Sequence, residues 1–292
     1  ESAHRRARKA QSNTWQQAIM PFMTQTLEYQ QAIEDWLQQA PSLVASGFGR
    51  RMSPALEPVL KAGRAVIPVG LLEQALLQGS RSSRRLALRE RMLNQAGVDS
   101  VEQLAQRPLP ACDRQWRKQR GWAMGLAGGT GAASGVVGMP GLVLDIPTLV
   151  LQSLIGIHRT GLCYGYDCMD DGASGFALGV FALASANTLA EKQAAWEALV
   201  ALHSLEAEAL RDGLEAAVAR QLGKGSVAAG MQNLARQLGV NLGRRKAAAV
   251  VPVIGALIGG SINAWVMHDL MRVARHAFIA RRIGLLGEPG KS

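Results

Sequence analysis

Aromatic side chains are scarce in this chain of 292 residues: they account for 5% of it, whereas hydrophobic residues as a whole account for 48%. The apolar content comes mainly from Ala, Leu, Gly and Val, and the aromatic residues that strands favour are few. We therefore expect an all-α protein. Cysteine is also rare. The three cysteines form no Cys-x-x-Cys pair, which argues against a disulfide framework and indicates a reducing compartment.

Charge is missing from a long stretch of the chain. No charged residue occurs in the segment 122–144, and seven of its positions are glycine. The segment is long enough to cross a bilayer, but each glycine weakens a helix by about 0.8–1.0 kcal/mol relative to alanine. Gly125/Gly129 and Gly131/Gly135 have the small-xxx-small spacing that lets helices pack closely. We expect this segment to pack against neighbouring helices rather than to span a membrane.

A secretory signal and nucleic-acid-binding motifs are missing as well. Residues 1–12 are polar and basic, without the apolar stretch of a signal peptide. The net charge is +10, but the basic residues are not interleaved with aromatic ones, and no zinc-finger, RNP or basic-zipper pattern occurs. We expect no nucleic-acid partner and a cytoplasmic location, peripheral to the inner face of the membrane, whose anionic surface attracts basic proteins.

The positive charge is concentrated at the two ends of the chain. The net charge is +8 over residues 1–120, −6 over 121–220 and +8 over 221–292. Basic clusters at 114–120 and 244–246 each stand directly before a glycine-bearing uncharged segment. We expect the following residues to contact anionic headgroups: Arg114, Arg117, Lys118, Arg120, Arg244, Arg245, Lys246, Arg272 and Arg275.

Amphipathic helices are predicted on both sides of the uncharged segments. Apolar residues recur at helical spacing over 15–37 and 226–242, and Thr188-x-x-Glu191 is a capping box that opens a helix reaching Leu214. A further basic helix has Leu270, Ala274, Ala277 and Phe278 on one face and Arg272, Arg275 and His276 on the other.

Three glycine-bearing apolar helices, at about 122–142, 146–164 and 247–267, are expected to form a central layer that the amphipathic helices wrap. The second of them is expected to start at Asp145, whose carboxylate would cap free amides, with Pro147 in its first turn.

Two parts of the chain carry the motifs of a known family. The first part contains Gly138-Met-Pro140-Gly141-Leu142, Asp145-Ile-Pro147 and Tyr164-Gly165-Tyr166-Asp167, and the second contains Pro252-Val-Ile-Gly255-Ala-Leu-Ile-Gly259 and Asn263. In this order and spacing they resemble the EcsC family over residues of about 120–280. The family is named after a bacterial operon that encodes an ABC transporter. The resemblance implies a helical, membrane-associated accessory protein, with a membrane transporter as a further partner.

The resemblance also suggests how the chain is divided. We expect an N-terminal amphipathic helical region at 1–107 and an EcsC-like helical domain at 108–292, or one continuous domain. After Asp167 the chain continues Cys168-Met-Asp-Asp-Gly-Ala-Ser, where the family has a Glu-rich helix start. The resemblance carries over no catalytic residues.

A few polar residues stand out in the apolar helices. Asp145 is either a helix cap, which we favour, or a functional carboxylate with a raised pKa. His158 lies on an apolar face, which is more typical of a buried core histidine than of a ligand or base. Asn263 either hydrogen-bonds to the 122–144 segment, which we favour, or lines a pocket. The residues predicted to line a pocket or to face lipid are Gly138, Pro140, Gly141, Asp145, Pro147, His158, Tyr164, Tyr166, Asp167 and Asn263.

We expect a peripheral membrane-associated or lipid-binding accessory protein rather than an enzyme, with no cofactor and no metal ion. The chain has no P-loop, no His-Glu-x-x-His and no Gly-x-Ser-x-Gly motif. His268, Asp269 and His276 come closest to a metal-ligand set. The alternative is a hydrolase or metal-dependent enzyme whose pocket uses Asp145, His158, Asp167 and His268.

Overall fold

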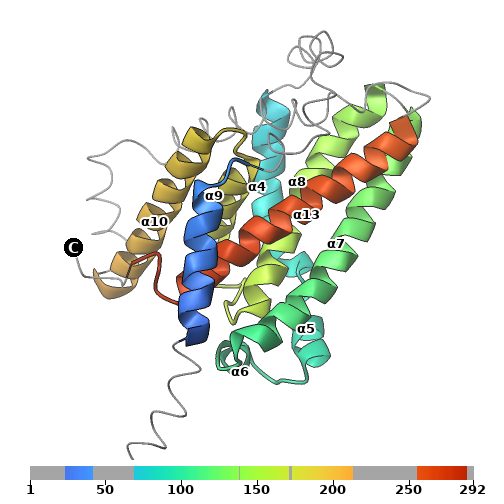
Figure 1. Cartoon of the computed structure of the whole chain (residues 1–292). Coiled ribbons are helices and arrows are strands. Elements are labelled where there is room, and N and C mark those ends of the chain that lie inside the picture. Colours follow the sequence, from blue (N-terminus) through green and yellow to red (C-terminus); the bar gives the residue numbers. More distant parts are fainter. Residues whose placement is uncertain (1–23, 42–68, 138, 171–172, 213–254, 288–292) are drawn as a thin grey trace, which may run out of the picture.

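The fold is described by a computed structural model for residues 24–41, 69–137, 139–170, 173–212 and 255–287 (Figure 1). All regular structure in these ranges is helical, so the predicted all-α class is confirmed. Four predicted features lie outside the described residues, namely the start of the first helix at 15–23, the helix at 226–242, the basic cluster Arg244, Arg245 and Lys246, and the first part of the third apolar helix at 247–254.

The described ranges contain the following helices. In chain order they are an N-terminal helix (24–38), α4 (Val69–Leu86), α5 (Arg89–Ala96), α6 (Val101–Ala105), α7 (Leu109–Val137), α8 (Met139–Cys163), α9 (Ala173–Ser185), α10 (Leu189–Asp212) and α13 (Gly255–Arg282).

The helix α13 crosses α7 and α8 and also contacts α9 (Figure 1). It approaches α7 closely where Gly260 meets Gly128, because a Cβ on Gly260 would lie 2.9 Å from the carbonyl oxygen of Gly128. This close backbone approach requires that Gly260 has no side chain. The predicted close packing of glycine-bearing helices is therefore present, but it uses Gly128, whereas Gly125 and Gly129 face open space.

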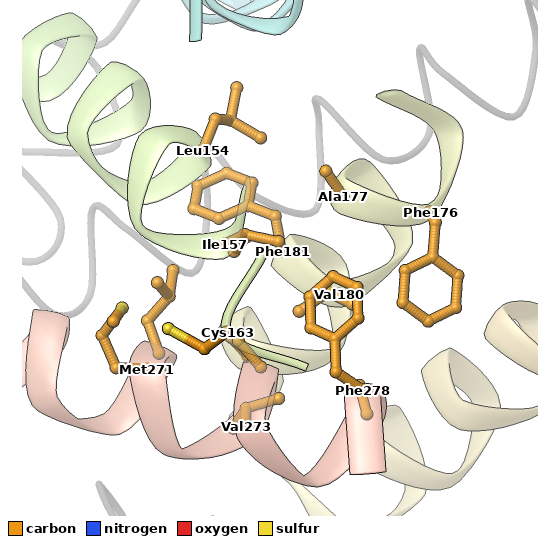
Figure 2. Packing of buried hydrophobic residues seen from close by; sticks show 14 of the residues in the cluster. Leu154, Ile157, Cys163, Phe176, Ala177, Val180, Phe181, Met271, Val273 and Phe278 are labelled. Atoms are coloured by element: carbon orange, nitrogen blue, oxygen red, sulfur yellow. The ribbon is translucent and has the colours of Figure 1, made fainter. Parts of the chain in front are cut away.

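Two more glycines let α13 pack along α8. A Cβ on Gly156 would lie 2.9 Å from the sulfur of Met271, and a Cβ on Gly161 would lie 2.9 Å from the ring of Phe278. The Phe278 ring also packs against Phe176 of α9, with the ring centroids 5.1 Å apart. Figure 2 shows side chains of α8, α9 and α13 meeting in this part of the core.

Sequence features explain the burial of α9 and the position at which α10 begins. α9 is apolar on all sides, and it is buried because α4, α8, α10 and α13 all contact it. α10 begins at the predicted capping box, which is confirmed. The backbone N–H of Glu191 donates to the Thr188 hydroxyl at 3.1 Å, and the Glu191 carboxylate accepts from the backbone N–H of Asn187 at 2.8 Å.

Three helix boundaries differ from the prediction. α7 begins at Leu109, so the basic run 114–120 belongs to the same helix as the glycines rather than preceding it. Pro108 and Pro110 stand at its start, where a missing N–H removes no intrahelical hydrogen bond. α8 begins at Met139 rather than at Asp145. α13 continues unbroken from Gly255 to Arg282, so the described part of the third apolar segment, 255–267, and the final basic helix are one helix.

Helices from both sides of residue 107 contribute to one hydrophobic core, which includes Ile33, Leu76, Leu154 and Phe278. The division at residue 107 and the central layer wrapped by amphipathic helices stay predictions. None of the helices in the described ranges combines the length and the apolar character needed to cross a membrane.

Candidate functional site

The residues predicted to line one pocket do not come together. Asp145 lies near the start of α8 and His158 near its end, and 13 residues at 1.5 Å each separate them by about 20 Å along the helix axis. Tyr164, Tyr166 and Asp167 come after the helix. Gly138 lies outside the described residues, and the structure does not describe the surroundings of Pro140 and Gly141. Pro147 is half-buried within α8.

Asp145 is a buried carboxylate shared between helices and not a helix cap. The amide nitrogen of Asn263 in α13 donates to its two oxygens at 3.0 and 3.3 Å, and the hydroxyl of Ser134 in α7 donates at 3.3 Å. The capping prediction is wrong because α8 already begins at Met139, directly after α7 ends. Asn263 does make the predicted cross-helix hydrogen bond, but its partner is Asp145, just beyond the 122–144 segment.

His158 is buried in the middle of the bundle, as predicted for a core histidine. Its Nε2 atom makes no hydrogen bond to the rest of the described structure. Burial, together with the positive charge of Arg84, lowers the pKa of His158 to about 4, so the imidazole is neutral at pH 7.

The residues of the turn after α8 contact three different helices and do not face one common site. Gly165 has a φ of 85°, and a Cβ there would lie 2.3 Å from the Cα of Ala105, so only glycine fits. The Tyr166 ring packs against Phe278, with centroids 5.6 Å apart. Asp167 pairs with Nε of Arg89 at 2.8 Å. These contacts fasten the turn to α6, α13 and α5, in that order.

One highly connected polar group is Asp113 of α7, which no sequence motif singled out. Arg275 of α13 donates to both of its oxygens at 2.8 Å. The hydroxyl of Tyr29 in the N-terminal helix donates at 2.8 Å, and that of Tyr164 donates at 2.5 Å. We call these four residues the Asp113 cluster. Arg275 is therefore committed to a carboxylate inside the protein, which corrects the prediction that it contacts headgroups.

The protonation states within the Asp113 cluster are fixed by its own contacts. Burial favours a raised pKa for Asp113, but the hydrogen bonds from Arg275 and Tyr164 outweigh burial and lower the pKa below its usual range. Burial and the hydrogen bond to Asp113 raise the pKa of Tyr29 to about 12. The cluster is an ion pair with two neutral phenols at pH 7, and it joins three helices and the turn after α8.

The second half of the N-terminal helix is held by Trp36. The Trp36 ring stacks on His276 of α13 with centroids 4.6 Å apart, and it meets Trp196 of α10 edge to face. Lys192 of α10 lies over the same ring at 3.9 Å and donates to the backbone carbonyls of Trp36 and Gln39. Burial lowers the pKa of Lys192 to about 8. A cation thus caps the C-terminal end of the helix.

The first half of the N-terminal helix is packed less tightly. A cavity of about 210 Å³ separates it from α13, with Gln25, Glu28 and Ile33 on one side and His276 and Ile279 on the other. Burial and nearby positive charges lower the pKa of His276 to about 3, so this side chain is neutral. The helix is therefore anchored by the Tyr29 hydroxyl in its first half and by the Trp36 contacts in its second half.

The basic residues predicted to meet headgroups differ in their surroundings. Arg114, Arg117 and Lys118 are exposed on α7. Arg120 and Arg272 are half-buried, and the guanidinium of Arg120 lies over the ring of Trp116 at 4.8 Å. The exposed members of this predicted set therefore lie on the first part of α7.

The exposed positions of α7 recur every three to four residues and form one continuous strip, which we call the outer face of α7. It consists of Arg114, Arg117, Lys118, Gly121, Trp122, Gly125, Leu126, Gly129, Ala133 and Val136. Single apolar side chains on a protein surface are normal, but apolar side chains gathered along one face mark an interaction site. α7 lies at one edge of the bundle, so the outer face is accessible along the helix (Figure 1).

In the part of the chain that the structure describes, no three His, Cys, Asp or Glu side chains lie close enough together to hold a metal ion. All three cysteines are free and buried. Burial raises the pKa of Cys163, Cys168 and Cys112, which keeps the thiols protonated.

These features define an all-α protein with a buried ionic cluster and one exposed helix face that is basic at one end and apolar at the other. A family model described as the EcsC protein family matches residues 28–283, and the chain belongs to this family. The match begins at the N-terminal helix and so extends well before residue 120, where the resemblance of the sequence motifs starts. No curated protein and no solved structure matches the chain.

Proposed function

We propose that the protein is a peripheral membrane protein that docks on an anionic bilayer through the outer face of α7. The supporting observation is the exposure of Arg114, Arg117 and Lys118 on one side of one helix. Asp113 is the only acidic residue of α7, and it faces inward, where Arg275 neutralises it. No carboxylate of α7 therefore competes with lipid phosphates for these cations.

The size of the electrostatic attraction follows from the number of cations. A Lys or Arg near an anionic leaflet contributes about 1 kcal/mol, so the three exposed cations contribute about 3 kcal/mol. This attraction is screened by salt, because the cations are in contact with water. Apolar side chains on the same face add a contribution that salt does not weaken.

The proposed location is the inner face of a membrane, where the anionic leaflet lies. The three free, buried cysteines agree with a reducing compartment. The proposed role is that of an accessory protein, and a membrane transporter as a protein partner stays a prediction.

Vesicle flotation tests this proposal. The protein should float with vesicles of phosphatidylcholine and phosphatidylglycerol at low salt and remain unbound with phosphatidylcholine alone. The double variant Arg114→Gln/Lys118→Gln should bind about 30-fold more weakly, since it removes two cations worth about 1 kcal/mol each. The matched control Arg85→Gln/Arg91→Gln removes two exposed cations from α4 and α5 and should bind like the wild type.

Two results would refute the proposal. One is indifference of the wild-type protein to anionic lipid at low salt. The other is an equal loss of binding in the control variant, because binding would then depend on overall charge and not on α7.

The alternative, an enzyme with a pocket around Asp145 and His158, is not supported by an arrangement in the structure. These side chains lie about 20 Å apart along α8. Asp167, a third member of that predicted pocket, is paired with Arg89. We therefore propose no reaction.

A further inference from the structure

The outer face of α7 changes character along the helix axis. Its first part carries Arg114, Arg117 and Lys118, and its exposed positions from Gly121 to Val136 include no polar side chain. At 1.5 Å per residue the apolar part is about 22 Å long. An ordinary interfacial helix has its polar and apolar residues on opposite faces and lies flat on the membrane. In α7 they are separated along the axis instead, which favours a tilted position.

Trp122 stands at the boundary between the basic and the apolar part. Its side chain is 44% exposed, and the guanidinium of Arg159 covers one face of the ring at 3.8 Å from the centroid. Arg159 is itself held by hydrogen bonds to the Ala87 carbonyl and to Gln119. The indole is thus fixed with its other side toward solvent. Tryptophan prefers the boundary between headgroups and acyl chains, the level that this position would take.

The apolar part is exposed at large side chains as well, since Leu126 is 38% and Val136 is 73% exposed. A second copy of the chain packed on this face would cover these residues but would bring no acidic group of α7 to the cations, because Asp113 is buried. An anionic bilayer offers both phosphates and acyl chains within the length of the helix. Charge complementarity therefore favours the bilayer as the occupant.

We infer that α7 enters an anionic bilayer obliquely, with its C-terminal end deepest, an inference that rests on the proposed function and adds an orientation to it. A tilt of about 25° from the membrane plane places Val136 about 10 Å deeper than Gly121, which matches the depth of interfacial helices. Arg114, Arg117 and Lys118 then lie at the phosphates, Trp122 at the boundary and Val136 among acyl chains.

Spin labels on single added cysteines measure this orientation. The variants Gly121→Cys, Gly129→Cys and Val136→Cys place the label on the outer face of α7 at increasing distance from the cations, and Gln193→Cys places it on the exposed surface of α10 as a control. The native cysteines are buried, and the parent protein gives their background labelling. Accessibility to oxygen and to a water-soluble nickel complex is measured with phosphatidylcholine/phosphatidylglycerol vesicles.

The expected result is protection from nickel and gain of oxygen contact in the order 136, 129, 121, with the label at 193 unchanged. Vesicle binding with equally water-exposed labels would overturn the oblique insertion and leave the proposed function standing. Protection at 136 already without vesicles, and unchanged by them, would also overturn it, because another part of the chain or a second copy would then cover the face. Failure to bind vesicles would overturn both.

A second variant pair tests insertion without labels. Val136→Glu places a charge at the expected deepest point and should weaken vesicle binding by at least about tenfold, because a carboxylate resists entry into acyl chains. Leu27→Glu makes the same change in charge at a 60% exposed leucine of the N-terminal helix and should bind nearly as the wild type does. Equal binding by the two variants would contradict insertion at Val136.

Discussion

The close contact between α7 and α13 makes a sharp prediction for Gly260→Ala. Alanine in place of glycine stabilises a helix interior by about 0.8–1.0 kcal/mol. At Gly260, however, the new Cβ would lie 2.9 Å from the carbonyl oxygen of Gly128 and 3.2 Å from the Cβ of Ala132, so the two helices must move apart. Overpacking of this kind costs about 1–3 kcal/mol. The net effect expected for Gly260→Ala is a loss of up to about 2 kcal/mol.

Gly129→Ala is the matched control, because nothing lies within 4 Å of its added Cβ. This variant should keep the whole gain in helix propensity, so the two alanine variants should differ by about 1–3 kcal/mol in the free energy of unfolding. Urea denaturation followed by far-UV circular dichroism measures both values. If Gly260→Ala proves as stable as Gly129→Ala, the argument that α7 and α13 touch through their backbones is refuted.

Three further predictions concern the buried polar groups. Asp113→Asn should destabilise the fold by about 3 kcal/mol at pH 7, because it leaves Arg275 without its counter-ion. The lowered pKa of Asp113 means that its stabilisation is present above about pH 4 and is lost as the pH falls further, so urea titrations of wild type and variant should converge in acid. The pKa of His158 falls from about 6.5 in the unfolded chain to about 4 in the fold. As the pH is lowered through this range, the wild type should therefore lose about 3 kcal/mol more of its free energy of unfolding than His158→Leu does. Thermal unfolding at several pH values measures this difference, which would be absent if the imidazole were charged in the fold. Asn263→Leu removes the buried hydrogen bonds to Asp145 and should cost about 1–3 kcal/mol in urea denaturation, whereas a neutral outcome would mean that Asp145 does not depend on them.

Local sequence signals predicted the local features of this fold well. The capping box at Thr188 and Glu191 lies where its spacing indicated, because its hydrogen bonds involve residues only a few positions apart. The burial of His158 followed from its place on an apolar helix face. Asp145 was misinterpreted for the same local reason: a carboxylate before a Pro is a typical cap signal, but the helix here starts earlier and carries the proline inside it.

The Asp113 cluster could not be predicted from local patterns. Asp113 stands beside the basic run 114–120, where a lone carboxylate usually indicates a solvated helix face. Its partners Tyr29, Tyr164 and Arg275 are 84, 51 and 162 residues away in the chain. Only the packing of α13 across α7 brings them together. For the same reason Arg275 on the polar side of the final helix was expected to contact anionic headgroups, although this side packs on Trp36 and Asp113.

The position of α13 late in the chain has a consequence for biosynthesis. Asp113 and Arg275 are 162 residues apart in the chain. At a synthesis rate of about 5–20 residues per second, Asp113 is therefore translated roughly 8–30 seconds before Arg275, its counter-ion. Trp116 is likewise translated well before Met271, to whose backbone carbonyl its indole N–H donates at 3.2 Å. Until α13 emerges, the surfaces of α7 and α8 that it covers in the finished fold stay exposed on the nascent chain.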